Sequence, residues 1–259
     1  MIKAIFLDID GTLVSFRTHR VPESTLEAIR EVRRQGVKVF IATGRPRPFI
    51  NNVEEVECDG VLSVNGACVT LTDGTRLAHD LIPREDVRRM VERQRAEDLP
   101  VVYASATDAF VSHIDDRVRA VFAQLDIPLP EVRPIETALD MDVMQLIAFF
   151  TAAQEPRILS ETLRGCTAVR WHPDFADCIR RGTDKASGVD AVLRHYGLHL
   201  SEAMAFGDGG NDIGMLSHVG WGVAMGNASP AVKAAARMVT ASVDDDGIAQ
   251  VLRRLPEWT

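Results

Sequence analysis

Two aspartates separated by one residue, Asp8 and Asp10, stand at the end of an apolar run near the start of the chain. The run Lys3 to Ile9 is β-branched and apolar, which predicts a strand, and Gly11 permits a sharp turn after it. Ligands of open α/β sheets bind beyond the carboxyl ends of the strands. One carboxylate can attack phosphorus or hold a cation while the other moves a proton, so the motif Asp8-Ile9-Asp10-Gly11-Thr12 indicates nucleophilic and acid–base chemistry.

An ordinary turn with aspartate as its cap is the competing interpretation of this motif. It would suffice for a single Asp-Gly pair. A match to all the fixed positions arises by chance only on the order of a few times in a thousand for a chain of this length, so we favour the functional interpretation.

A second polar stretch, Thr43-Gly44-Arg45, follows the apolar run Val37 to Ala42. If both runs are strands of one parallel sheet, the Thr43 hydroxyl and the adjacent backbone N–H groups lie at the same sheet edge as Asp8 and form a phosphate cradle. A solvated loop arginine is the alternative for Arg45 taken alone.

A third stretch, Gly207-Asp208-Gly209-Gly210-Asn211-Asp212, follows the predicted strand Ala203 to Phe206. Asp208 is placed to bind a hard cation through oxygen, although a helix cap by Asn211 or Asp212 would also explain the pattern. Lys185 precedes a predicted helix and is either a surface charge or the cation that offsets a bound phosphate.

The elements that must position these residues alternate between strands and helices. A helix at Glu23 to Gln35 joins the first two strands, and Val61 to Val64 adds a third. The pattern returns with a helix from about Lys185 to Tyr196. Between the two halves, the pattern changes to two predicted hairpins with interleaved helices, the first of them around Arg84 to Ala96, which indicates an α+β insertion with its own core. The hairpins pair Val101 to Ala104 with Phe110 to Ile114, and Ala168 to His172 with Ala176 to Arg180. We predict an α/β fold, a Rossmann-like parallel-sheet core at 1–82 and 183–259 with a cap domain at 83–182.

Composition limits the possible partners. The net charge of −8 disfavours nucleic-acid binding, which requires a basic surface. The longest apolar runs fall well short of the roughly 20 residues of a membrane span, and no signal peptide is recognisable, so we expect a cytoplasmic protein. The four cysteines are scattered without metal or disulfide spacing. The oligomeric state stays open.

These motifs, in this order, resemble those of the haloacid dehalogenase superfamily of phosphotransferases, specifically its Cof-type branch with a class IIB cap. The resemblance implies that Asp8 is the nucleophile, Asp10 the general acid and base, Thr43 the phosphate-binding hydroxyl and Lys185 the cation that steadies Asp8 and the phosphate. One departure is Ala186-Ser187 after Lys185, where many members of the superfamily have glycine.

The resemblance also implies a Mg²⁺ site made by the Asp8 carboxylate, the Asp10 backbone carbonyl and Asp208, with Asp212 in support. The loop Ser63-Val64-Asn65-Gly66-Ala67 looks like the Cof-type loop near the substrate entrance, and an ordinary turn is the alternative. We assign substrate contacts to Gly11, Gly44, Arg45, Asn65 and Asn211.

We therefore expect a magnesium-dependent phosphatase that hydrolyses small phosphate monoesters, with sugar phosphates as the expected class, through an aspartyl phosphate on Asp8. A haloacid dehalogenase is a weaker alternative, because displacement of a halide needs neither a proton donor nor magnesium. A signalling receiver and a non-catalytic sugar-phosphate-binding protein are further alternatives. Steady phosphate release would exclude both.

Overall fold

The computed structural model describes residues 1–255, apart from the Trp171 side chain, and divides into two compact units. The first unit comprises Met1–Thr43, Asn51–Ala78 and the chain from Asp184 onward. The second comprises Gly44–Ile50 and His79–Thr183. Each unit has its own sheet and its own buried apolar core.

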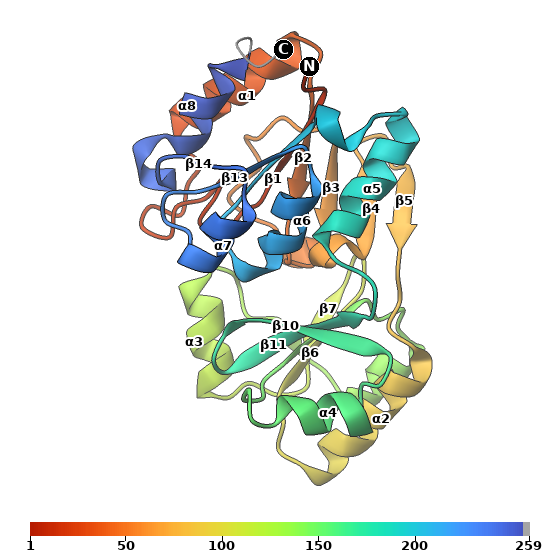
Figure 1. The fold of residues 1–259 in the computed structure, drawn as a ribbon. Helices are drawn as coiled ribbons and strands as arrows, with labels where there is room; N and C mark the ends of the chain where they lie inside the picture. The colour runs from red at the N-terminus through yellow and green to blue at the C-terminus, as the bar shows by residue number, and fades with distance from the viewer. Residues whose placement is uncertain (256–259) are drawn as a thin grey trace. The chain divides into compact units, whose positions relative to one another are not determined.

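The first unit is built on an eight-stranded sheet in the order β14-β13-β12-β1-β2-β3-β4-β5 (Figure 1). Strand β1 lies in the middle and pairs in parallel with both β2 and β12. The predicted α/β core with a parallel sheet is confirmed. The strands are β1 (Ala4–Leu7), β2 (Lys38–Ala42), β3 (Gly60–Ser63), β4 (Cys68–Leu71), β5 (Arg76–His79), β12 (Ala203–Gly207), β13 (Trp221–Ala224) and β14 (Met238–Val239).

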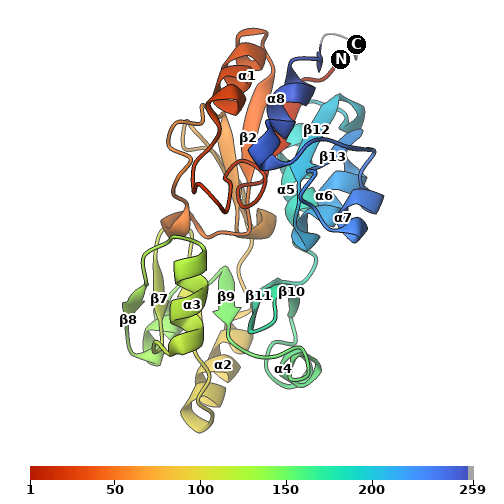
Figure 2. The ribbon, with the colours of Figure 1, turned by 90° about the vertical axis from the view of Figure 1, so that its left-hand side faces the viewer.

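Helices cover both faces of this sheet. Ala4 and Phe6 of β1 belong to a cluster with buried side chains of three helices, whereas Ile5 and Leu7 point to the opposite face and are also fully buried. Helices α1 and α8 lie side by side, apart from α5, α6 and α7 (Figures 1 and 2). These helices are α1 (Glu23–Arg34), α5 (Lys185–Tyr196), α6 (Ile213–His218), α7 (Pro230–Ala235) and α8 (Gly247–Leu252).

Strands β4 and β5 were not predicted from the sequence. Strand β4 runs antiparallel to β3, and the turn after it is closed by hydrogen bonds from Gly74 N to Leu71 O and from Thr75 N to the Asp73 carboxylate. Strand β5 is largely exposed or half-buried, so it lacks the continuous apolar run that marks a central parallel strand. An edge extension of this kind carries only a weak pattern.

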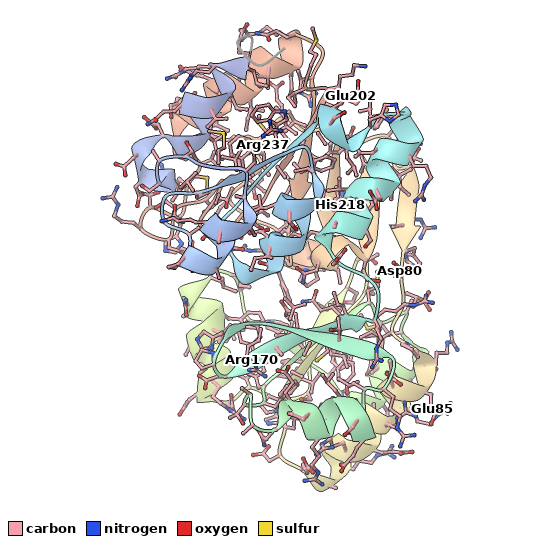
Figure 3. The ribbon with its side chains drawn as sticks, viewed as in Figure 1. Asp80, Glu85, Arg170, Glu202, His218 and Arg237 are labelled. Carbon is pink, nitrogen blue, oxygen red and sulfur yellow. The ribbon has the colours of Figure 1, made fainter. Side chains whose placement is uncertain are left out.

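The second unit has a six-stranded sheet in the order β10-β11-β9-β6-β7-β8, with mostly antiparallel pairs. The two predicted hairpins, β6–β7 and β10–β11, are both present. Arg170 of β10 (Figure 3) donates hydrogen bonds to Phe150 O and Phe175 O and pairs with Glu155 of α4. The elements are α2 (Arg84–Ala96), β6 (Val101–Ala104), β7 (Ala109–Val111), α3 (Asp116–Gln124), β8 (Glu131–Val132), β9 (Gln145–Ala148), α4 (Glu155–Glu161), β10 (Cys166–His172) and β11 (Phe175–Arg180).

The segment Gly44–Ile50 belongs to the second unit, although its position before residue 83 placed it in the predicted core. Phe49 packs edge-on against Phe122 of α3, with ring centroids 5.3 Å apart. Arg45 donates a hydrogen bond to Leu125 O at the end of the same helix, at 3.4 Å. These long-range contacts decide the grouping, and they have no local sequence signal.

Within residues 1–255, no helix combines the length and the apolar character that crossing a membrane would require.

Candidate active site

The loop after β1 holds Asp8 and Asp10 in a tight turn. Leu13 N donates to Asp8 O at 3.1 Å, and Val14 N donates to Ile9 O at 2.8 Å. Asp8 is only 5% exposed, whereas Asp10 is half-buried. The strand thus ends with one carboxylate inside the sheet edge and a second, more accessible carboxylate beside it.

Gly11 is required because the Asp208 carboxylate occupies the space where a side chain would begin. A Cβ on Gly11 would lie 2.2 Å from Asp208 Oδ2, and the residue has φ +80°, which glycine adopts without strain. Its N–H donates to Val14 O at 2.9 Å. The Gly11 N–H is therefore used inside the loop, and the absence of a side chain allows the two aspartate loops to approach closely.

Lys185 lies at the first turn of α5, whose N-terminus is closed by a reciprocal capping box between Asp184 and Ser187. The lysine is 1% exposed, and Nζ donates to Asp8 Oδ1 at 2.5 Å and to Asp212 Oδ1 at 2.6 Å. The Ala186-Ser187 departure from the family pattern therefore leaves the lysine in contact with the predicted nucleophile.

Helix α5 approaches the loop after β3 closely enough to exclude side chains at the contact. A Cβ on Gly66, which has φ +90°, would lie 2.2 Å from Asp184 O, and a Cβ on Gly188 would lie 3.0 Å from the Gly66 Cα. This close approach fixes where the first turn of α5, and hence Lys185, meets the sheet edge.

Asp212 connects the lysine to the loop after β12. It is fully buried, and its Oδ2 accepts hydrogen bonds from Asp208 N at 3.0 Å and Gly209 N at 2.9 Å, while Oδ1 accepts from Lys185. Asp212 precedes α6, but its side chain does not cap that helix. The same carboxylate accepts from Gly209 N at the start of the 3₁₀ turn Gly210–Asp212 that leads into α6, so a capping contact and the organisation of the loop occur together.

Thr43, Asn65 and Asn211 come together from three loops. Asn65 N donates to Thr43 O at 3.0 Å, and Asn211 Nδ2 donates to Asn65 Oδ1 at 3.0 Å. Asn65 is 2% exposed, adopts the left-handed conformation with φ 49°, and its Nδ2 is a buried donor without a hydrogen-bond partner. A ligand oxygen is the partner that such a donor needs.

Arg45 makes hydrogen bonds to backbone carbonyls of the protein. Its side chain is buried, and Nη1 donates to Phe49 O at 3.0 Å in addition to the Leu125 contact. It and Gly44 belong to the second unit, whereas the other predicted site residues belong to the first. The guanidinium thus satisfies the carbonyl of Phe49 and the carbonyl of Leu125 at the end of α3, a role that the Thr-Gly-Arg pattern did not indicate.

Two residues that the sequence analysis did not single out complete the site. Thr12 Oγ1 donates to Asp208 Oδ1 at 2.9 Å, and Asn227 Nδ2 donates to Asp208 Oδ2 at 3.2 Å. Thr12 is the last residue of the first motif. Asn227 follows the carboxyl end of β13, so the rule that located Asp8 also applied to it.

Burial and mutual repulsion raise the pKa of two carboxyl groups. Desolvation, and then the charge of Asp212, raise the pKa of Asp8 well above its ordinary value although Lys185 opposes the shift. The same two causes raise the pKa of Asp208 to about 7, against the hydrogen bond from Thr12. Burial alone would lower the pKa of Lys185, but the charges of Asp212 and Asp8 outweigh burial and raise it. The lysine therefore stays protonated.

The carboxylates of Asp8, Asp208 and Asp212 can together hold a divalent cation. One oxygen from each lies within 4.8 Å of the others, and carboxylate oxygens are the ligands that hard cations prefer. Burial, and after it the negative charge of Asp212, raise the pKa of both Asp8 and Asp208, and a bound cation would offset both effects. The donor set thus fits a metal ion. The proposed contribution of Asp10 is a backbone carbonyl, outside this carboxylate cluster.

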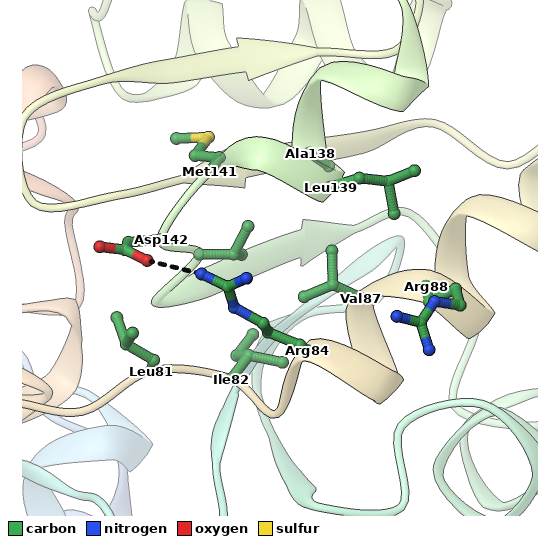
Figure 4. Close-up of a pocket in the computed structure, with 10 residues that line it drawn as sticks. Leu81, Ile82, Arg84, Val87, Arg88, Ala138, Leu139, Met141 and Asp142 are labelled. Carbon is green, nitrogen blue, oxygen red and sulfur yellow. Dashed lines mark ion pairs between the residues drawn. The ribbon is translucent and has the colours of Figure 1, made fainter.

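The second unit contains a separate pocket of about 150 Å³ (Figure 4). Apolar side chains such as Ile82, Val87 and Leu139 form much of its lining, and its carboxylate, Asp142, lies 3.8 Å from the Arg84 guanidinium. This pairing differs from the three close carboxylates and buried lysine of the first unit, which remains the candidate active site.

Comparisons with known proteins identify the family of the chain. A family model described as haloacid dehalogenase-like hydrolase matches residues 5–252. YkrA of Bacillus subtilis (strain 168), which carries a provisional phosphatase name, is 34% identical over 257 residues, 98% of this chain and 97% of its own. The 5-amino-6-(5-phospho-D-ribitylamino)uracil phosphatase YitU of the same strain is 30% identical, with 96% of each chain covered.

A solved structure of the subclass IIB sugar phosphatase BT4131 is 39% identical and superposes with a TM-score of 0.91 over 98% of this chain and 99% of that one. The fold similarity therefore extends over both units and not only over the sheet that carries the aspartates. The family model likewise spans both units. The chain belongs to the haloacid dehalogenase-like hydrolases, and it is an enzyme of that superfamily.

Proposed function

We propose that this enzyme is a Mg²⁺-dependent phosphatase that hydrolyses small phosphate monoesters through an aspartyl phosphate on Asp8. The observation that carries the proposal is the environment of that carboxylate. Lys185 holds Oδ1 at 2.5 Å, and within residues 1–255 Oδ2 accepts no hydrogen bond from a protein donor. One oxygen is thus oriented by a cation while the other is left for attack on phosphorus.

In the first step, an Asp8 oxygen attacks phosphorus while the bond from phosphorus to the ester oxygen breaks. Asp10, half-buried beside the nucleophile, gives its proton to that leaving oxygen. In the second step, water attacks the phosphorus of the aspartyl phosphate, Asp10 takes a proton from the water, and Asp8 is released with inorganic phosphate. The sum is hydrolysis of the ester.

The remaining side chains bind and orient the phosphoryl group. Lys185 supplies a buried positive charge, and Thr43 and the unpartnered Asn65 amide supply neutral donors. A Mg²⁺ ion held by the Asp8 carboxylate, the Asp10 carbonyl and Asp208, with Asp212 in support, would offset phosphate charge in the transition state. Asn211 orients the Asn65 amide and could itself reach the substrate.

The expected substrates are sugar phosphates or compounds with a phosphorylated polyol chain. BT4131 is a sugar phosphatase, and YitU acts on a ribitylamino phosphate, so two similar proteins act on phosphates of carbon chains rich in hydroxyl groups. We propose that the second unit, 83–182 by the sequence boundaries, is the cap that selects among such esters. A cytoplasmic location would give access to them.

The test is phosphate release from a panel of sugar phosphates, nucleotides and phosphorylated cofactors, with Mg²⁺ or with EDTA. The wild type is expected to release phosphate from several small esters only with Mg²⁺, and Asp8→Asn is expected to release none. Absence of release from every ester would contradict the proposal. Binding without turnover would favour a phosphate-binding protein, and halide release from a haloacid would favour a dehalogenase.

A further inference from the structure

Asn227 makes three hydrogen bonds to three different segments of the first unit. Its Nδ2 donates to Gly11 O at 2.8 Å and to Asp208 Oδ2 at 3.2 Å, and its Oδ1 accepts from Val243 N at 3.0 Å. These segments are the loop after β1, the loop after β12 and the turn before α8. One short side chain therefore joins both aspartate loops to the C-terminal part of the unit.

The partners allow only one orientation of this amide. A carbonyl and a carboxylate can only accept hydrogen bonds, so the NH₂ group must face Gly11 and Asp208. A backbone N–H can only donate, so the amide oxygen must face Val243. The segment behind Val243 is itself held in place, because Ser15 Oγ donates to Asp244 Oδ1 at 2.7 Å. Asn227 is thus anchored on one side and directs its donor to the metal-site loop on the other.

Asp208 is held differently from Asp8. Each of its two oxygens accepts a hydrogen bond from a neutral donor, Oδ1 from Thr12 at 2.9 Å and Oδ2 from Asn227 at 3.2 Å. Lysine, in contrast, contacts Asp8 directly. Neutral donors fix the direction of a carboxylate without cancelling its charge, so the charge of Asp208 stays available for a cation. Each oxygen also keeps a lone pair for a ligand bond.

We propose that Asn227 is a positioning residue that orients Asp208 for Mg²⁺. This inference rests on the Mg²⁺ of the proposed function. It concerns a residue that is not among the predicted metal ligands. Removal of the amide leaves the Asp208 carboxylate with Thr12 as its one side-chain donor among the described residues, and it leaves Gly11 O and Val243 N without the Asn227 partner. Loss of a hydrogen-bond partner behind a metal ligand typically lowers metal affinity about 10- to 100-fold.

The test is titration calorimetry of Mg²⁺ into EDTA-stripped and dialysed protein, with Asn227→Ala compared with Thr240→Val. The control removes one hydrogen bond, from Thr240 Oγ1 to Gly247 O at 2.7 Å, near the same C-terminal segment. We expect the Kd for Mg²⁺ to rise about 10- to 100-fold in Asn227→Ala and to stay within about twofold of wild type in Thr240→Val. Turnover of Asn227→Ala at low Mg²⁺ should recover as Mg²⁺ is added.

An unchanged Kd in folded Asn227→Ala would overturn the inference, as would an equal loss of affinity in Thr240→Val. If Asn227→Ala fails to fold, Asn227→Ser serves instead, because a serine hydroxyl is too short to reach both Gly11 O and Asp208. A Kd within twofold of wild type in that variant would also overturn the inference. If the wild type binds no Mg²⁺, both the cofactor assignment and this inference fail, whereas Mg²⁺ binding without phosphatase activity contradicts only the proposed function.

Discussion

Lys185 is buried between Asp8 and Asp212, and replacing either aspartate by asparagine should affect the free energy of unfolding very differently. Asp212→Asn exchanges one acceptor oxygen for an NH₂ group. The lost oxygen accepts either from Lys185 Nζ or from two backbone N–H groups, so in both orientations buried donors face a donor. Asp8→Asn removes a charge that burial and Asp212 already disfavour.

The expected magnitudes follow from these environments. Breaking a buried ion pair from one side costs about 3–5 kcal/mol. Loss of the Asp212 charge also removes its repulsion with the Asp8 carboxylate, which offsets part of that cost. We therefore expect Asp212→Asn to lower the free energy of unfolding by about 3 kcal/mol. Asp8→Asn should leave the free energy of unfolding unchanged or raise it in metal-free buffer, because burial and the charge of Asp212 disfavour the ionised carboxylate that asparagine replaces.

The assay is urea denaturation followed by circular dichroism, near pH 7.5 with EDTA, fitted separately if the two units unfold in separate transitions. Asp8→Asn and Asp212→Asn are matched controls for each other, because both convert an aspartate that contacts the same lysine into its amide. The reasoning is refuted if Asp8→Asn destabilises as much as Asp212→Asn, or if Asp212→Asn lies within about 1 kcal/mol of wild type.

Three further predictions concern pH, catalysis and the second unit. The pKa of Asp208 is raised to about 7, so its contribution to stability is present at low pH and is lost as the pH rises toward 7. The gain in Tm from Mg²⁺ should therefore be larger near pH 8 than near pH 5.5. An equal gain at the two pH values would contradict this prediction. Asp10→Asn should lower steady turnover about 10²- to 10⁴-fold. With p-nitrophenyl phosphate, whose leaving group needs no proton, the variant should still show a burst of about one product per chain. The absence of a burst would mean that Asp10 is needed for formation of the aspartyl phosphate even with this leaving group. In the second unit, Asp86→Ala should cost about 3–5 kcal/mol of unfolding free energy, because the 2%-exposed carboxylate forms an ion pair with Arg89 and accepts from Gly165 N at 2.6 Å. Asp142→Ala removes a 59%-exposed partner of a 3.8 Å pair and should cost less than about 1 kcal/mol in the same urea assay.

The sequence alone predicted the elements whose signals are local. Helices α2 and α5 have the predicted bounds, Arg84–Ala96 and Lys185–Tyr196, because apolar periodicity continues up to a clear stop, such as Gly197 after α5. The parallel strands were recognisable as continuous apolar runs because helices bury both of their faces.

Local sequence patterns also predicted most residues of the candidate site. Asp8 and Asp208 follow neighbouring parallel strands, and the carboxyl ends of such strands meet at one sheet edge. Lys185 could be chosen from the charge that a phosphate site needs, and the structure brings it into contact with Asp8.

Only the tertiary structure decided what depends on distant contacts. It assigned Gly44–Ile50 to the second unit, turned Arg45 toward the carbonyls of Phe49 and Leu125, and added the half-exposed edge strand β5. It also brought Asn227 to within hydrogen-bond distance of Gly11 and Asp208. Residue type and spacing indicate which groups can perform the chemistry, but the partner of a side chain far along the chain is set by packing, which no local pattern encodes.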